Sequence, residues 1–571
     1  MIILVGKLRL KEKNIIPFFL GLNALVGMIL FIIFVLPRSE ANNQLVFGLS
    51  TSRVLIALVF LALLLVNLGA ILISVFEFGA WQERLKTKLA SLFSNHNAGI
   101  MISLYAALIL TSTFLLLSVP PIIRPLSFLE PFSARLSSII GWLFFSSILF
   151  IILLRTITPI EESKSQLIAR LDQILILFGL FIIIFFLYAH FAALIGWIGK
   201  TKYSFFDLLA EQFTKGKLYI ENPPYTHDLT LYKGKWYAPM PPLPAILLMP
   251  LAYLVGAENI STSYLSMVAS AINGVFLFLI LKELNTRKWI SLSTRSIFIL
   301  VILFLFGTPH LWMGISGRGW YFSQILTLLF LALAAYAALR KKSAWLVGAL
   351  IAIAITARPT GLMTSPFYFA IAMQIKKEEN GEVTLKEAAQ WIAKTLPFIG
   401  LAIIGLLFYN YLRFEDFFDF GYVTVNAGPE IVYNVQTWGT FSTHFMPINL
   451  QVMLFKLPFW NPSGRWLIEP SATGMSIFLT TPALIYIFRR YSKDWWIIGS
   501  WSAVFLTVSL LSLYHNTGAH QFGYRYILDF LVPLMVLLAV GFKKRIPWHF
   551  QLLVIASIAI NLYGAHWFMN G

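Results

Sequence analysis

Apolar runs of about 20 residues recur along the whole chain and constrain its fold more than any other feature. A helix of that length crosses the ~30 Å hydrocarbon core of a bilayer. Hydrophobic residues fill 58% of the 571 positions and charged residues only 12%, whereas about a quarter of an ordinary soluble chain is charged. The sequence therefore predicts an all-α polytopic membrane protein whose main solvent is lipid.

We expect about fifteen membrane spans. They are assigned to the apolar runs near 15–36, 54–77, 99–119, 137–154, 172–198, 263–282, 296–308, 323–339, 344–357, 361–375, 395–412, 474–488, 495–513, 526–541 and 548–566. The first four contain few polar residues. Residues 1–165 are therefore interpreted as an appended N-terminal module of about four helices, and residues 166–571 as the core.

Lysine and arginine gather in alternate connections between these runs, as they do in short cytoplasmic loops. The clusters lie at 7–13, 84–88, 155–170, 282–295, 340–342, 376–394, 489–493 and 543–545. This pattern predicts a cytoplasmic N-terminus and, for an odd number of spans, an external C-terminus. The all-helical architecture and the many Lys and Ile residues favour a multi-pass plasma-membrane protein. The charge pattern also argues against nucleic acid as a partner, because the net charge of +18 is divided among loops and forms no single basic stripe.

Two long connections, 199–262 and 413–473, fall on the outer, periplasmic or extracellular side in this topology. Long ordered loops in compact proteins are often functional. The first contains an apolar, proline-rich stretch at 242–255 that is too short for a span. We expect it to form an interfacial helix at the membrane surface.

The first long connection also concentrates acidic side chains, which are scarce in this chain. Four of them are considered, Asp207, Glu211, Glu221 and Asp228. A carboxylate at such a place can act as a general base on a hydroxyl when burial or a neighbour tunes it. The alternative is that all four are solvated loop acids that pair with nearby lysines.

Arginines expected at the outer ends of spans form a second candidate group. Arg318, Arg358 and Arg525 run against the cytoplasmic bias of positive charge. A guanidinium is a rigid donor fork suited to phosphate oxygens, and charge near the membrane is costly enough to suggest function. The alternative is that these side chains extend to lipid headgroups.

Motifs for metal and nucleotide chemistry are not recognised. The chain has no cysteine and no HExxH pattern, Walker loop or dinucleotide fingerprint. No cofactor is predicted, although loop carboxylates leave a divalent ion open as an alternative. Energy for a reaction is then expected to arrive within the substrate.

Several stretches, in order, carry a family resemblance. Residues 206–219 (FDLLAEQFTKGKLY) are similar to an LAxxxxxGxLY motif, and residues 228–244 (DLTLYKGKWYAPMPPLP) to a D…YxGxxYxxxPPGxP block. Three later stretches also fit, at 357–361, 409–414 and 522–526. Over about 170–541 the chain resembles GT-C superfamily glycosyltransferases, including relatives of dolichyl-phosphate-mannose protein mannosyltransferases.

This resemblance implies a GT-C-like core and a membrane glycosyltransferase. Its donor would be a polyprenyl-phosphate-linked sugar, its acceptor an unspecified hydroxyl, and its outcome inversion at the anomeric carbon. Many relatives carry an Asp-Glu pair where this chain has Lys202-Tyr203-Ser204. The base is therefore assigned first to Asp228, with Asp207 and Glu221 behind it.

The resemblance also suggests binding residues. Donor phosphate is assigned to Arg358 and Arg525, followed by Arg318 and Lys235. Sugar or acceptor binding is assigned to Tyr232, Trp236, Tyr237 and His310, because aromatic faces can stack on sugar rings. For the aromatic side chains the alternative is a belt at the membrane interface.

Other classes of function fit a polytopic chain. A transporter or flippase usually places polar residues at the bilayer midplane, whereas here they cluster at outer ends. A polymerase or ligase acting on lipid-linked glycans is a second alternative, and a non-catalytic assembly subunit a third.

Overall fold

A computed structural model describes residues 45–46, 49–50, 166–195, 197, 201, 203–489, 491–518, 520–542 and 545–570. The chain divides into two compact units, residues 1–179 and residues 180–571. The described strands of the first unit are β1 (Leu45–Val46) and β2 (Leu49–Ser50), which pair antiparallel. The four spans expected between 15 and 154, and Lys202, lie outside the described residues.

The second unit is mainly helical, and α7 begins before its boundary. The α-helices are α7 (Gln166–Leu194), α8 (Phe206–Thr214), α9 (Leu243–Val255), α10 (Thr262–Thr286), α11 (Thr294–Phe306), α12 (His310–Ser316), α13 (Gly319–Leu339), α14 (Ala344–Ala357), α15 (Ser365–Asn380), α16 (Leu385–Phe414), α17 (Pro429–Trp438), α18 (Met446–Leu454), α19 (Ile477–Thr480), α20 (Trp495–Ser512), α21 (Leu531–Val540) and α22 (Trp548–Asn570).

Short elements connect these helices. The 3-10 helices are η3 (Ala257–Asn259), η4 (Pro359–Thr364), η5 (Thr443–Phe445), η6 (Pro482–Ile487) and η7 (Arg525–Phe530). The strands form two small antiparallel pairs, β3 (Thr230–Tyr232) with β4 (Lys235–Tyr237), and β5 (Phe459–Trp460) with β6 (Ile468–Glu469).

Five helices of the described residues are long and apolar enough to cross a membrane, namely α10, α13, α16, α20 and α22, and the bent pair α11–α12 is a sixth if it counts as one span. Eleven of the fifteen expected spans fall after residue 165, so the expected count is too high. The apolar runs at 474–488 and 526–541 explain part of the difference. They fold into short pieces, because Pro482 opens η6 and η7 precedes an α21 of only 10 residues.

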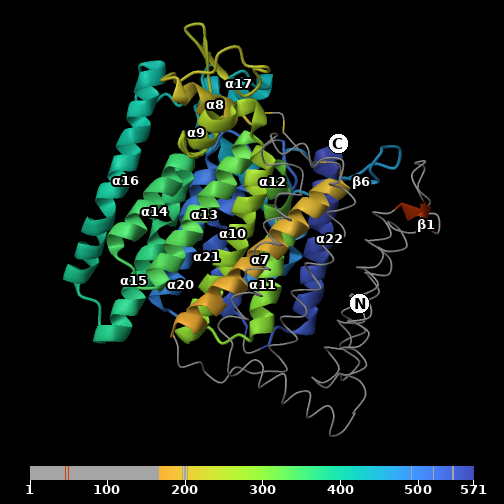
Figure 1. Ribbon diagram of the computed structural model, residues 1–571. Helices are drawn as coiled ribbons and strands as arrows, with labels where there is room; N and C mark the ends of the chain where they lie inside the picture. The colour runs from red at the N-terminus through yellow and green to blue at the C-terminus, as the bar shows by residue number, and fades with distance from the viewer. Residues whose placement is uncertain are drawn as a thin grey trace. The chain divides into compact units, whose positions relative to one another are not determined.

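The centre of the second unit is formed by α10 and α13. In their most apolar windows 78% and 83% of the residues are buried, against 22% for α16. Helix α16 lies along α14 at the edge of the bundle (Figure 1). Within the second unit, α16 therefore exposes most of its surface, and α20 and α22, with 44% and 39% of their windows buried, expose part of theirs.

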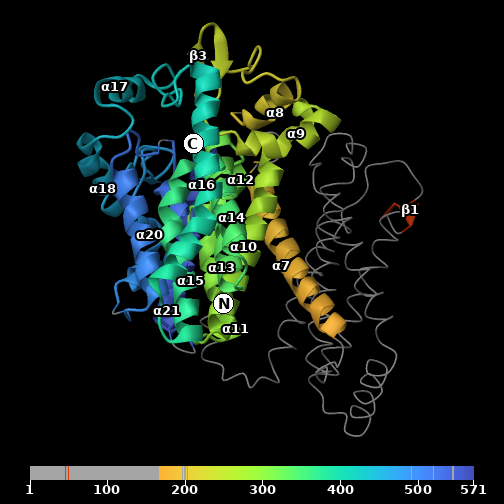
Figure 2. The same cartoon turned by 90° about the vertical axis from the view of Figure 1, so that its left-hand side faces the viewer.

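The first long connection caps one end of the bundle with α8, α9 and the β3–β4 hairpin (Figures 1 and 2). A two-residue turn closes the hairpin, because Lys233 and Gly234 both adopt positive φ, 46° and 73°. The basic connections after α10, α13 and α15 lie at the opposite end (Figure 1).

Candidate functional site

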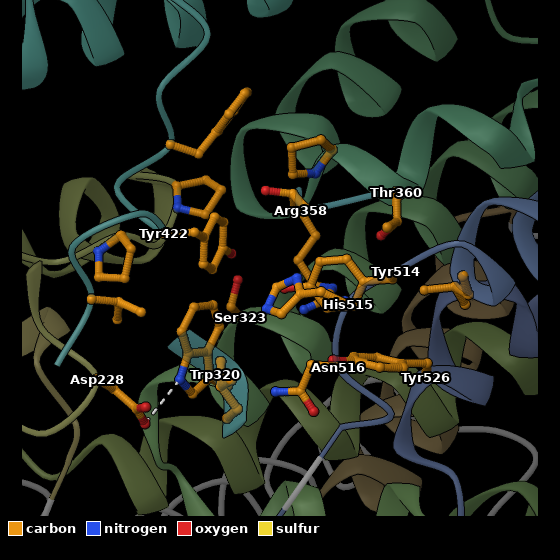
Figure 3. A pocket seen from close by; sticks show the side chains of 18 of the residues that line it. Asp228, Trp320, Ser323, Arg358, Thr360, Tyr422, Tyr514, His515, Asn516 and Tyr526 are labelled. Carbon is orange, nitrogen blue, oxygen red and sulfur yellow. Dashed lines mark hydrogen bonds between the residues drawn. The ribbon is translucent and has the colours of Figure 1, made fainter. Parts of the chain in front are cut away.

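A cavity of about 730 Å³ lies at the capped end of the bundle. Its walls come from both long connections, the start of α13, the junction of α14 and η4, the connection after α20, and η7. Figure 3 shows polar and aromatic side chains from these elements pointing into it. Of the sequence-predicted site residues, the cavity brings together Asp228, Arg318, Arg358 and Arg525.

Asp228 is held in the cavity wall by its backbone and by Trp320. Its φ of 65° lies in the left-handed region, which aspartate tolerates better than most residues. Its backbone N–H donates to the carbonyl of Asn426 at 2.8 Å. The indole N–H of Trp320 donates to its Oδ2 at 3.2 Å (Figure 3). The side chain is 29% exposed, so the carboxylate keeps room to accept a further proton or hydrogen bond.

Arg525 is buried in this wall without a carboxylate partner among the described residues. It is 4% exposed, and its guanidinium lies over the rings of Tyr526 at 4.8 Å and Tyr321 at 5.2 Å. Its Nη2 reaches the Tyr526 hydroxyl at 3.3 Å, whereas Nε and Nη1 have no hydrogen-bond partner there. A buried, uncompensated guanidinium is costly, and an anion would relieve that cost.

Arg318 provides a second such cation at the start of α13. Its guanidinium lies 5.2 Å from the ring centre of Phe568 and 5.3 Å from that of Trp197, and its Nε has no partner among the described residues. Gly317 makes this position possible. It has φ 62°, and a Cβ there would lie 2.4 Å from the Cα of Ser263.

Arg358 differs, because it already has a partner. Its Nη2 contacts Oδ2 of Asp529 at 3.1 Å, in an ion pair whose side chains are 13% and 1% exposed. Asp529 also accepts hydrogen bonds from Thr360 at 2.9 Å and from Gln324 at 3.0 Å. Arg525 and Arg318 are therefore better phosphate candidates than Arg358. Asp529 was not among the predicted site residues. Its position inside the apolar run 526–541 is the sequence signal that could have found it, because a charge in such a run needs a partner.

The other charged candidates do not line the cavity. Asp207 is fully buried and accepts a hydrogen bond from Ser204 at 2.5 Å. Glu221 is on the surface, where an ion pair with Lys217 at 2.6 Å lowers its pKa. Lys235 is exposed, with its Nζ 4.6 Å from the ring centre of Tyr219.

The predicted sugar-binding residues also lie elsewhere. Tyr232 and Tyr237, on the β3–β4 hairpin, pack edge-on against Phe414 at 5.7 and 5.3 Å, and Trp236 is the middle residue of β4. His310 is fully buried in the bundle and hydrogen-bonded to the hydroxyl of Tyr188 at 2.7 Å. None of the four lines the cavity.

The cavity contains aromatic and imidazole side chains that sequence reasoning did not select. They are Tyr422, Tyr514, His515, His520 and Tyr526. Tyr422 stacks on Trp320, with ring centres 6.3 Å apart. Burial lowers the pKa of His515 to about 4, and burial together with Arg318 lowers that of His520. His515 is therefore neutral near pH 7 and adds no positive charge.

Among the residues that the structure describes, no group of three or more histidine or acidic side chains is placed to hold a metal ion. Comparisons with known protein families, with characterised proteins and with solved structures gave no match. A proposal for the function therefore rests on the side chains that line the cavity.

Proposed function

We propose that this protein is an integral-membrane glycosyltransferase of GT-C type. It moves a sugar from a polyprenyl-phosphate-linked donor to an acceptor hydroxyl on the non-cytoplasmic face. One observation carries the proposal. A single cavity at the end of a helical bundle holds a partly exposed carboxylate, Asp228, and two guanidiniums without carboxylate partners among the described residues, Arg318 and Arg525.

The two kinds of group suit the two halves of such a reaction. The acceptor hydroxyl loses its proton to Asp228 as its oxygen attacks the anomeric carbon. The bond from that carbon to the phosphate oxygen breaks, and the charge that develops on the leaving phosphate is stabilised by Arg525 and Arg318. Asp228 and Tyr526, over which Arg525 lies, are on separate walls (Figure 3). Attack from the side of Asp228 and departure toward Arg525 give inversion.

The charge of the cavity favours a phosphodiester donor. Arg318, Arg358 and Arg525 contribute three positive charges, and Asp228 with Asp529 contributes two negative charges. The remaining single positive charge matches the single negative charge of a sugar linked through one phosphate to a lipid. Neutralising a buried site in this way is favourable.

The arrangement of charge also supports a position of the cavity on the non-cytoplasmic side of the membrane. The basic connections 282–295, 340–342 and 376–394 lie at the end of the bundle away from the cavity (Figure 1). Because short cytoplasmic loops are enriched in Lys and Arg, that end is assigned to the cytoplasm. Helix α9, with Tyr253 and Leu254 80% and 74% exposed, suits the outer membrane interface.

Transfer of radiolabelled sugar by the purified protein in lipid tests this proposal. Polyprenyl-phosphate sugars would be the donors, with a panel of hydroxyl acceptors and with water as the default acceptor. We expect wild type to turn over and Asp228→Asn to lose at least about 100-fold in rate, because the amide cannot take up the proton.

Glu221→Gln is the matched control, since it removes an acid of the same connection that lies outside the cavity. Its rate should equal that of wild type. A folded wild-type protein that binds donor without turnover would contradict the enzyme proposal and favour transport. Full activity in Asp228→Asn would remove Asp228 as the base.

A further inference from the structure

The segment at residues 438–468, within the second long connection, exposes an unusual amount of apolar surface. Ten of its large apolar side chains are exposed, and Phe455, Leu457 and Trp460 are 72%, 63% and 67% exposed. In residues 203–242 of the first long connection, Leu231 is the one large apolar side chain that is exposed. Residues 438–468 and residues 203–242 therefore present different surfaces, although both lie at the capped end of the bundle.

Charge follows the same division. Residues 203–242 contain eight charged side chains, four acidic and four basic, in 40 positions. Residues 438–468 contain two in 31 positions, Lys456 and Arg465, and both are basic. A surface rich in Trp, Phe, Leu and Ile with only basic charge is typical of protein that lies in a lipid–water interface.

The segment is hydrogen-bonded to two candidate membrane spans, α20 and α22. In α18, the side chain of Asn449 donates to the carbonyls of Ser512 at 3.1 Å and Tyr514 at 2.8 Å, where α20 ends. In the β5–β6 hairpin, Ile468 accepts a hydrogen bond from the hydroxyl of Tyr563, in α22. These contacts place the segment beside the C-terminal parts of α20 and α22.

The position of the segment also separates it from α8 and α9 of the first long connection. Figure 2 shows α18 beside the upper end of α20, on the side of the bundle away from α8 and α9. Phe441 belongs to the segment, is 51% exposed and also lines the cavity. The apolar surface therefore reaches the edge of the cavity.

We propose that residues 438–468 lie in the outer lipid–water interface, with their aromatic and aliphatic side chains inserted among lipid headgroups and the first acyl carbons. The cavity is then bordered by lipid at Phe441 and by water at the wall that carries Asp228 and His227. The inference does not depend on sugar transfer, and its test uses no substrate.

The absence of cysteine from the chain allows a direct test with single labelled sites. Phe455→Cys and Trp460→Cys would each carry an environment-sensitive fluorophore in nanodiscs that hold one copy of the full chain. Lys233→Cys is the matched control, because its side chain is 61% exposed, close to the exposure of Trp460, and lies in the first connection. Iodide would quench from water, and doxyl-labelled phospholipid from the bilayer.

We expect iodide to quench the fluorophore at 455 and 460 at least about threefold less than at 233, and doxyl lipid to quench only 455 and 460, because interfacial groups are shielded from water and contact lipid. Iodide quenching at 455 and 460 equal to that at 233 would overturn the proposal. So would quenching by neither agent, since that result means a protein surface covers the segment.

Discussion

At the scale of single residues, the cavity shows how a partner decides what a buried charge can do. Arg358 and Arg525 both line it, and both are largely buried. Asp529 compensates the first, whereas the second faces two aromatic rings and keeps two N–H groups without partners among the described residues. Arg358 therefore has a structural role in an ion pair, whereas Arg525 is a candidate for binding an anion.

Burial of His515 predicts a loss of stability in acid. Its pKa is lowered to about 4 in the folded protein, against about 6.5 in the unfolded chain. As pH falls through that window the unfolded chain takes up a proton that the folded protein does not, so the free energy of unfolding falls. Above about pH 6.5, His515 is neutral in both the folded and the unfolded state, and it no longer lowers the free energy of unfolding. Thermal unfolding followed by tryptophan fluorescence in detergent measures it.

His515→Gln removes the titrating group, and we expect its melting temperature to fall less than that of wild type between about pH 7 and about pH 4.5. His444→Gln is the control, since that imidazole is exposed on the surface. Equal pH dependence in wild type and His515→Gln would contradict the assignment.

At the scale of elements, α16 depends on one close contact. It is the least buried of the membrane-length helices and packs mainly on α14. A Cβ at Gly348 of α14 would lie 2.7 Å from the Cα of Thr395 and 2.8 Å from its carbonyl oxygen. The two backbones approach so closely only because this residue has no side chain. The far end of α16 carries Arg413, which donates to the carbonyl of Ala238 and so connects α16 to the first long connection.

Gly348→Ala should therefore destabilise the protein, although alanine favours a helix over glycine by about 1 kcal/mol. The added methyl group collides with backbone, and such overpacking costs about 1–3 kcal/mol. Gly400→Ala on α16 is the control, because a Cβ there meets nothing within 4 Å, and its melting temperature should not fall. A rise in melting temperature for Gly348→Ala in the same assay would show that the helices do not approach as described.

At the scale of the whole molecule, apolar run length and charge placement predicted much that the structure has. The chain is mainly helical with several membrane-length helices, as run length predicted. Four of the residues selected from the sequence, Asp228, Arg318, Arg358 and Arg525, line one cavity, and their roles stay predictions. The number of spans was not predictable from run length, because run length does not reveal that η6 and η7 interrupt the apolar runs.

The sequence also could not predict which of the candidate residues line the cavity. Asp207 and Asp228 are acids of the same connection, and only three-dimensional packing buries the first against Ser204 and turns the second into the cavity. Asp529 was detectable in principle, because a carboxylate inside an apolar run needs a partner.

The central claim is that the guanidiniums of Arg525 and Arg318 hold the donor phosphate while Asp228 faces the acceptor. A structure of the protein in a nanodisc with a non-hydrolysable phosphonate analogue of a polyprenyl-phosphate sugar tests it most directly. We predict phosphonate oxygens within hydrogen-bond distance, about 2.7–3.2 Å, of both guanidiniums, and the sugar between them and Asp228. An analogue bound outside this cavity, or within it with both guanidiniums unengaged, would contradict the account.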